Sequence, residues 1–241
     1  RPAMLFNSLP FLIFFPCVFV LYYALPFRFR KYMLLAASYY FYMCWKPEFI
    51  VLILFSTLVD YFCGLGMARY PGRKKWLLAL SLTMNLGLLF FFKYLNFFGE
   101  TLTALCRAVS IPFSAPALNI ILPVGISFYT FQTLSYTLDV YRGRLEPERD
   151  FVTFALFVSF FPQLVAGPIE KASNLLPQLK EEHRFTYENA SWGAKLMAWG
   201  FFKKMVVADQ LAVLLVDPVY QNPGSYEGGI LVLATCTFAF Q

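Results

Sequence analysis

The chain has 241 residues, of which 59% are hydrophobic and only 14% are charged, and it contains 29 Phe and 15 Tyr. Soluble domains hold roughly 45–50% apolar and about 25% charged residues, so the composition excludes an ordinary soluble domain and predicts a polytopic membrane protein. The basic residues behind the net charge of +6 gather at the ends of apolar runs, which is typical of membrane anchors and not of a nucleic-acid-binding surface.

The five cysteines give no sign of a metal site or a disulfide framework. No two of them form a CxxC pair, and most lie within apolar runs: Cys17, Cys44, Cys63, Cys106 and Cys236. We therefore expect small, membrane-compatible side chains and no bound metal. The opening run Phe6–Leu25 lacks a basic n-region and a small-residue cleavage site, so it is interpreted as a retained span and not as a signal peptide.

Apolar runs divide the chain into about seven or eight segments that we expect to be helical. Spans are predicted at Phe6–Leu25, Tyr32–Trp45, Phe49–Ala68, Trp76–Phe98, Ala117–Tyr141 and Phe151–Val165, with a partly interfacial helix at Ala190–Val216 and the start of another run at Gly229–Gln241. The Tyr32–Trp45 run covers only roughly 21 Å, short of a hydrocarbon core of about 30 Å. Either it borrows flanking residues or the bilayer is locally thin there.

Other segments are expected to be irregular or bent. Glu100–Pro116 is predicted to be a loop or an interfacial segment, because Pro112 and Pro116 break helices. A bend is expected near Pro123 and Gly125. The polar stretch Glu170–Glu188 is expected outside the hydrocarbon core.

Basic clusters at Arg28–Lys31 and Arg69–Lys75 predict the orientation of the first spans. If both clusters face the cytoplasm, the N-terminus lies outside and Asp139 and Arg142 lie near the cytoplasmic side. Beyond Pro168 the charge pattern is too mixed to continue this assignment.

The most informative segment is LPVGISFYTFQTLSYTLDVYRG (Leu122–Gly143), because it is apolar enough to enter a bilayer yet carries many polar side chains. On a helix, six of its residues share an arc of about 140°: Tyr129, Gln132, Ser135, Tyr136, Asp139 and Arg142. The stripe is consistent with interhelical hydrogen bonds or with the lining of a polar cavity. Gln132 and Asp139 are the candidates for a cavity, although Asp139 can equally pair with Arg142.

Three threonines on the same segment, Thr130, Thr133 and Thr137, are expected to be structural, because Thr can bond back to the carbonyls of its own helix. The dipeptide Gly167-Pro168 predicts a turn that ends a helix. Both Lys203 and Lys204 lie among apolar residues. They are interpreted either as a pair that snorkels to the lipid headgroups or as a contact for an anionic donor or lipid head.

His183 is the only histidine in the sequence and lies in a charged stretch, with no Ser, Cys or carboxylate partner at the spacing of a triad. It is expected to be a solvated loop residue and not a general base. No P-loop, GxSxG, HExxH or EF-hand pattern occurs, so these enzyme classes are not indicated.

Three motifs carry a resemblance to a known family. The segments LPVGISFYTFQTLSYTLDVYRG (Leu122–Gly143), FPQLVAGPIEK (Phe161–Lys171) and GFFKKMVVADQLA (Gly200–Ala212) resemble the membrane-bound O-acyltransferases in order and spacing, as does FFKYLNFF (Phe91–Phe98). The resemblance implies an all-α polytopic protein whose tilted and short helices form a ring around a central funnel. Gly167 and Pro168 would then shape the funnel, and Tyr129, Gln132, Ser135, Tyr136 and Asp139 would line or support it.

The resemblance also implies the reaction. An acyl group, carried as an acetyl thioester or on an acyl-carrier protein, is delivered from the cytoplasm and passed to an acceptor outside, with no cofactor held by the protein. The catalytic histidine of the family belongs to a later Trp-His motif that this sequence lacks. Residues 1–241 are therefore expected to be one incomplete transmembrane domain, the N-terminal portion of an acyltransferase, inactive alone and with no catalytic residue of its own.

The function expected from the sequence is O-acetylation of an extracytoplasmic polysaccharide such as alginate, by a multi-pass protein of the bacterial inner membrane. The expected partners are the bilayer, the acyl donor or carrier, the polysaccharide and soluble acetylation proteins, but no nucleic acid. Two alternatives remain open: a transporter or flippase in which the stripe lines a permeation route, and a non-catalytic scaffold for acetylation.

Overall fold

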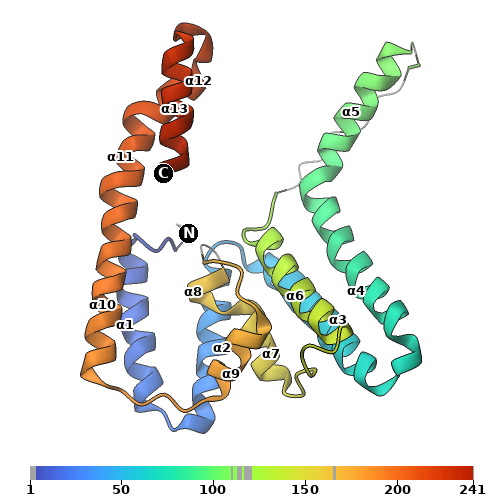
Figure 1. The fold of residues 1–241 in the computed structure, drawn as a ribbon, viewed down its shortest axis with the longest axis vertical. Coiled ribbons are helices and arrows are strands. Elements are labelled where there is room, and N and C mark those ends of the chain that lie inside the picture. Colours follow the sequence, from blue (N-terminus) through green and yellow to red (C-terminus); the bar gives the residue numbers. More distant parts are fainter. Residues whose placement is uncertain (1–3, 110, 113–115, 117–120, 165–166, 241) are drawn as a thin grey trace. The chain divides into compact units, whose positions relative to one another are not determined.

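The computed structural model of the protein describes residues 4–109, 111–112, 116, 121–164 and 167–240. These residues form helices, turns and loops, and no strand occurs among them (Figure 1). The helices in chain order are α1 (Leu9–Ala24), α2 (Phe27–Met43), α3 (Ile50–Arg69), α4 (Lys74–Leu89), α5 (Leu95–Ala108), α6 (Ile126–Tyr141), α7 (Phe151–Ser159), α8 (Phe161–Leu164), α9 (Ala172–Lys180), α10 (Tyr187–Phe202), α11 (Asp209–Leu211), α12 (Asp217–Gln221) and α13 (Gly228–Phe240). The all-α class predicted from the sequence is confirmed for this part of the chain.

The chain groups into two compact units. The larger unit contains Pro16–Glu182, and the smaller contains Leu5–Phe15 together with His183–Gln241. In the smaller unit, α13 packs against α12 and against the π-helical turn Ala212–Val216. A hydrogen bond of 3.2 Å from the Tyr220 hydroxyl to Thr235 Oγ1 joins α12 to α13.

In the larger unit, α3, α4 and α6 contact one another, while α7 and α9 pack beside them and α2 contacts α7 and α8. Figure 1 shows α6 crossing in front of α3. The two helices approach closely at Gly64, where an added Cβ would lie 2.9 Å from the Tyr136 hydroxyl oxygen. The absence of a side chain at Gly64 therefore sets how near α6 can come to α3.

The helices α3 and α4 bury several polar residues beside apolar ones such as Ile53 and Met67, and they expose many large apolar side chains. On α3 the buried positions include Ser56, Thr57 and Asp60, whereas Val51, Phe55, Leu58 and Phe62 are exposed. On α4 the buried positions include Ser81 and Asn85, whereas Trp76, Leu80 and Met84 are exposed. Exposed apolar and buried polar faces are the arrangement that lipid favours, because lipid cannot satisfy polar groups.

Two helices in the described part are long and apolar enough to cross a membrane: Pro47–Arg69, with 23 residues, and Pro71–Ala108, with 38. The second extends beyond the predicted span Trp76–Phe98, because α4, a π-helical turn at Phe90–Tyr94 and α5 run on without a break. Of the two alternatives for Glu100–Pro116, the loop is therefore wrong as far as Ala108, whereas the interfacial segment stays a prediction. No proline lies between Trp76 and Pro112, and the Thr101 hydroxyl bonds back to the Phe97 carbonyl at 2.8 Å.

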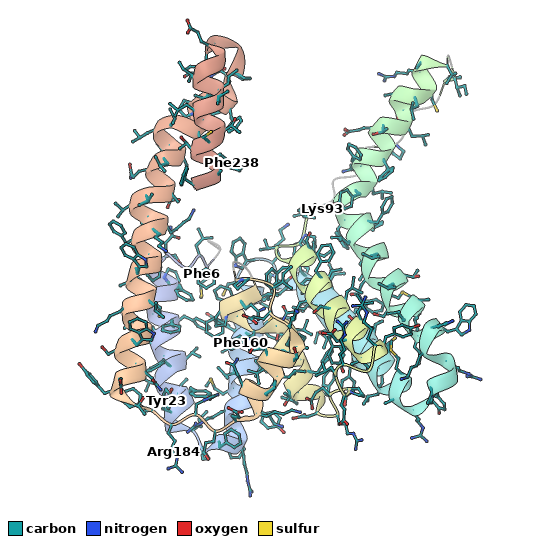
Figure 2. All side chains as sticks on the ribbon, viewed as in Figure 1. Phe6, Tyr23, Lys93, Phe160, Arg184 and Phe238 are labelled. Carbon is teal, nitrogen blue, oxygen red and sulfur yellow. The ribbon has the colours of Figure 1, made fainter. Side chains whose placement is uncertain are left out.

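The predicted spans at Ala117–Tyr141 and Phe151–Val165 are shorter in the structure. The expected bend near Pro123 is instead the start of α6, because Gly125 adopts a left-handed conformation with φ of 75° and the helix begins after it. Residues 117–120 lie outside the described residues. In the second segment α7 ends at Ser159 and α8 begins at Phe161 (Figure 2 labels Phe160 at the junction), since Pro162 removes a donor and its ring would clash with the carbonyl one turn back.

Candidate functional site

Gln132 on α6 satisfies a carbonyl that the break between α7 and α8 leaves without a helical partner. In an unbroken helix the Phe157 carbonyl would accept from the Phe161 amide, but that amide donates to the Ser38 hydroxyl at 3.2 Å. Gln132 Nε2 donates to the Phe157 carbonyl instead, at 2.8 Å, and its side chain is buried. Of the two interpretations of the stripe, interhelical bonding is thus realised at Gln132.

Tyr136, one turn beyond Gln132 on α6, holds the loop that precedes α7. Its fully buried hydroxyl accepts a hydrogen bond of 3.0 Å from the Glu148 amide, and the buried Glu148 carboxylate pairs with Lys180 of α9. The neighbouring Asp150 accepts from the Val152 amide at 3.1 Å, which caps α7, and it forms an ion pair with Lys31 of α2. These contacts tie four elements of the larger unit together at the α6–α7 loop.

Asp150 illustrates how this loop is stabilised electrostatically. Partial burial alone would raise the pKa of Asp150, but hydrogen bonds from Lys31 and Thr153, together with the Lys31 charge, outweigh it and hold the pKa below its ordinary value. The charged carboxylate is therefore the form that the folded protein prefers.

The remaining stripe residues have other surroundings. Ser135 donates to the Gln132 carbonyl of its own helix at 2.8 Å. Asp139 is half-buried, and no ion pair joins it to Arg142 within the described ranges. Tyr129 is fully buried, and no described residue bonds to its hydroxyl. The structure thus assigns a protein partner to Gln132, Ser135 and Tyr136, whereas the funnel-lining role proposed for the stripe stays a prediction.

The densest polar cluster lies on the other face of α6, and we call it the Asp60 cluster: Ser56, Asp60, Ser81, Asn85 and Thr137. Asp60 is fully buried. Asn85 Nδ2 lies 3.0 Å from each of its carboxylate oxygens, Ser81 donates to one of them, and Thr137 Oγ1 approaches at 3.4 Å. Ser56 in turn donates to Asn85 Oδ1. The cluster joins α3, α4 and α6 through one carboxylate whose hydrogen-bonding capacity is met.

The sequence analysis missed this cluster, although a signal existed. Asp60 is an ionisable residue in the middle of the predicted span Phe49–Ala68, and such residues mark buried or functional positions by default. The expectation for the threonines fits better: Thr137 bonds back to the Thr133 carbonyl and Thr133 to the Thr130 carbonyl, both at 3.1 Å.

Gly167 and Pro168 form the turn that follows α8. The Gly167 amide donates to the Gln163 carbonyl at 2.9 Å, and an added Cβ on Gly167 would lie only 2.8 Å from Gln163 Cα. Gln163 Nε2 donates to the Pro168 carbonyl at 3.1 Å. A glycine is therefore required by close backbone approach, and Gln163 fixes the turn.

Lys203, Lys204 and His183 belong to the smaller unit. Lys203 and Lys204 are exposed and open a π-helical turn at Lys203–Ala208 that follows α10. Lys204 forms an ion pair of 2.7 Å with Asp209, and the Lys203 ammonium lies 5.4 Å from the centre of the Trp199 ring. His183 lies in an exposed stretch between α9 and α10, as expected for a loop residue.

Known proteins resemble the chain over most of its length. It is 37% identical over 239 residues to the "Probable alginate O-acetylase AlgI" of Pseudomonas putida, an alignment that covers 96% of this chain and 48% of the relative. The protein of that name from Azotobacter vinelandii is 39% identical over 216 residues, with 87% and 42% covered. A "Peptidoglycan O-acetyltransferase" of Helicobacter pylori is 33% identical over 213 residues, with 76% and 39% covered.

The chain spans about half the length of the curated relatives it matches. No protein-family model matches the sequence, and no solved structure matches it. The relatives nevertheless agree in kind, since each is named as an enzyme that transfers acetyl groups to a polysaccharide or to peptidoglycan. Together with the three motifs, these similarities place the chain in the membrane-bound O-acyltransferase family.

Proposed function

We propose that the protein is an O-acyltransferase that acetylates a polysaccharide outside the cytoplasmic membrane. The observation that carries this proposal is the alignment of 96% of the chain with a probable alginate O-acetylase at 37% identity. Since the chain spans about half of that relative, residues 1–241 are proposed to build the membrane scaffold around the reaction. The general base is proposed to lie elsewhere, because His183 is exposed in a loop and does not enter the Asp60 cluster.

The proposed scaffold is multi-pass, with its N-terminus outside and a central funnel. The buried polar and exposed large apolar side chains of α3 and α4 support a lipid environment. The nine residues of α7 reach only about 14 Å and cannot cross a hydrocarbon core of about 30 Å, so a segment of this kind is suited to a thinned funnel wall. The stripe on α6 would border the funnel where its side chains are not already bonded to protein.

The acyl donor is proposed to be an acetyl thioester, free or on a carrier protein, that arrives from the cytoplasm. Lys203 is the better placed of the two lysines for an anionic donor, because Lys204 is already paired with Asp209. No cofactor is required for acyl transfer from a thioester to a hydroxyl.

The acceptor is proposed to be an alginate-like polysaccharide, and peptidoglycan is the second candidate. The alginate O-acetylases are 37% and 39% identical to the chain, whereas the peptidoglycan enzyme is 33% identical over a smaller share. Both acceptors present sugar hydroxyls on the outer side of the membrane, so the same chemistry serves either.

The test is to express the product of the complete reading frame that contains residues 1–241 in a bacterium whose own membrane O-acetyltransferases are deleted but whose soluble acetylation proteins remain. Ester-bound acetate is then released by mild alkali from purified polysaccharide and, separately, from peptidoglycan. We expect acetate on the polysaccharide, and acetate on peptidoglycan alone would reassign the acceptor. If the protein reaches the membrane and neither polymer gains acetate over the empty-vector strain, the proposed function is wrong.

A further inference from the structure

Four buried polar side-chain atoms have no hydrogen-bond partner among the described residues: Tyr42 Oη, Trp45 Nε1, Tyr129 Oη and Gln163 Oε1. Elsewhere in the larger unit the buried polar groups that the sequence or the fold singled out are satisfied, including Asp60, Gln132 and Tyr136. An unpaired buried hydroxyl is unfavourable unless something outside the protein core meets it. The exceptions therefore point to a ligand and not to a generally loose core.

Two of the four, Tyr42 and Tyr129, lie near α8. Tyr42 lies one turn beyond Ser38 and next to Phe41, and both of these contact Phe161 of α8: the Ser38 hydroxyl accepts from the Phe161 amide, and the Phe41 and Phe161 ring centres are 5.7 Å apart. We call this region, bounded by α2, α6 and α8, the α8 corner.

Tyr129 reaches the same corner from α6. It lies one turn beyond Gly125, where an added Cβ would be 3.0 Å from the Leu164 carbonyl of α8. Both phenols belong to one apolar cluster and are at most 2% exposed, and no hydrogen bond joins them among the described residues. Two buried hydroxyl donors thus lie in the same apolar cluster without using each other.

We propose that the hydroxyls of Tyr42 and Tyr129 bind the carbonyl oxygen of the acyl donor. A carbonyl oxygen has two lone pairs and can accept from both phenols at once, whereas an ammonium group has no lone pair to offer. When the acceptor attacks, negative charge develops on this oxygen, and donors fixed in an apolar site stabilise that charge strongly. The tyrosines form no covalent bond and give up no proton in this role.

This inference rests on the proposed function, because it names the part of the substrate that the α8 corner recognises. Gln163 borders the corner, but its Nε2 is held by the Pro168 carbonyl and no contact brings its oxygen to the phenols. The proposal therefore concerns the two tyrosines alone.

Phenylalanine substitutions separate a ligand role from a structural role. Tyr42→Phe and Tyr129→Phe remove an unpaired hydroxyl and keep the ring, so each variant is expected to unfold at the same temperature as the wild type or higher. The acetyl-transfer rate per folded protein is nevertheless expected to fall by about tenfold or more, as on the loss of one donor to a developing oxyanion. The matched control is Tyr136→Phe, whose hydroxyl accepts from the Glu148 amide. It is expected to lower the unfolding temperature, with activity that follows the folded fraction.

A binding measurement makes the outcome independent of polymer acetylation. The probe is S-acetyl-N-acetylcysteamine, a small acetyl thioester, added to the detergent-purified product of the complete reading frame. We expect it to raise the unfolding temperature of the wild type and of Tyr136→Phe but not of Tyr42→Phe or Tyr129→Phe. If Tyr42→Phe and Tyr129→Phe show the same thermal shift and the same transfer rate as the wild type, the proposed carbonyl site is wrong, while the proposed acetyltransferase function stands. If the thermal shift is lost in the two variants but the wild type places no acetate on either polymer, the thioester site stands and the proposed acetyltransferase function is wrong.

Destabilised Tyr42→Phe and Tyr129→Phe proteins with activity in proportion to their folded fraction would also overturn the proposal. That result would mean that the hydroxyls have a structural partner in the complete protein.

Discussion

The Asp60 cluster and the α8 corner both bury polar groups in the larger unit, but they treat them in opposite ways. In the Asp60 cluster one carboxylate collects donors from α4 and α6, and the amide beside it is met by Ser56. In the α8 corner two phenol hydroxyls have no partner among the described residues, in an equally buried setting. In an environment without water, the satisfied groups hold the helices together and the unsatisfied ones are available to a substrate.

The largest expected effect comes from removing the centre of the satisfied cluster. Asp60→Ala removes the carboxylate that accepts from Ser81 and Asn85 in a buried site, so we expect a loss of about 3 kcal/mol or more in the free energy of unfolding. Thermal unfolding in detergent measures this loss of stability. The control is Glu146→Ala, a substitution of an exposed residue, which should change the stability little. An unfolding temperature for Asp60→Ala equal to that of the control would contradict a structural role for the cluster.

The close approach of α3 and α6 can be tested next. Gly64→Ala places a methyl group 2.9 Å from the Tyr136 hydroxyl oxygen, and Tyr136 cannot move away easily because it is fully buried and bonded to the Glu148 amide. We expect a loss of about 1–2 kcal/mol in unfolding free energy. Gly87→Ala on α4 is the matched control: nothing lies within 4 Å of its added Cβ, and the helix propensity of Ala raises stability slightly. Equal effects of the two substitutions would show that helix spacing at Gly64 is not tight.

Gln132 tests whether a stripe residue can be structural and not only a lining residue. Gln132→Ala deprives the Phe157 carbonyl of its donor where α7 ends, so the unfolding free energy should fall by about 1 kcal/mol. Acetylation per folded protein is the second readout. Unchanged stability with lost acetylation would return Gln132 to a purely functional role, and normal acetylation would remove it from the funnel wall.

The smallest effect is expected at the Lys31–Asp150 pair, because both side chains are about one-third exposed. The pKa of Asp150 is lowered on folding, so the charged form stabilises the protein above the ordinary pKa of Asp, about 3.9, and this contribution is lost as the pH falls further. Asp150→Asn keeps a good capping side chain but removes the charge. It should lose about 0.5 kcal/mol at pH 7, and its difference from the wild type should shrink as the pH falls below the ordinary pKa of Asp and the carboxylate becomes protonated. A difference that stays the same down to full protonation of Asp150 would mean that charge is not involved.

The sequence predicted those features that depend on composition and on local chemistry. Apolar runs located α1, α3 and α13 within a few residues, and the dipeptide Gly167-Pro168 indicated the turn after α8. The back-bonding of the threonines on α6 follows from one helix alone, so it too was accessible. The three motifs were sufficient for the family, which the relatives confirm.

What the sequence did not predict depends on contacts between distant segments. Asp60, Asn85 and Thr137 come from three helices, and a search for a polar stripe within one segment cannot connect them. The continuation of the helix to Ala108 was missed because polar residues after Phe98 were interpreted as a loop, although no proline interrupts them before Pro112. Whether a polar side chain on α6 has a hydrogen-bond partner also depends on its neighbours. Tyr129 and Tyr136 lie on one stripe, yet within the described part of the chain the Tyr136 hydroxyl has a partner and the Tyr129 hydroxyl has none.

The division between satisfied and unsatisfied polar groups is tested most directly by comparing Tyr129→Phe with Tyr136→Phe in the product of the complete reading frame. The two residues lie two turns apart on α6 and are equally buried, so the substitutions differ only in what each hydroxyl meets. Unfolding temperature and acetyl transfer per folded protein are measured on the same preparations. We expect a stable but slow Tyr129→Phe protein and a less stable Tyr136→Phe protein of normal specific activity. The reverse pattern, or equal effects on both quantities, would contradict it.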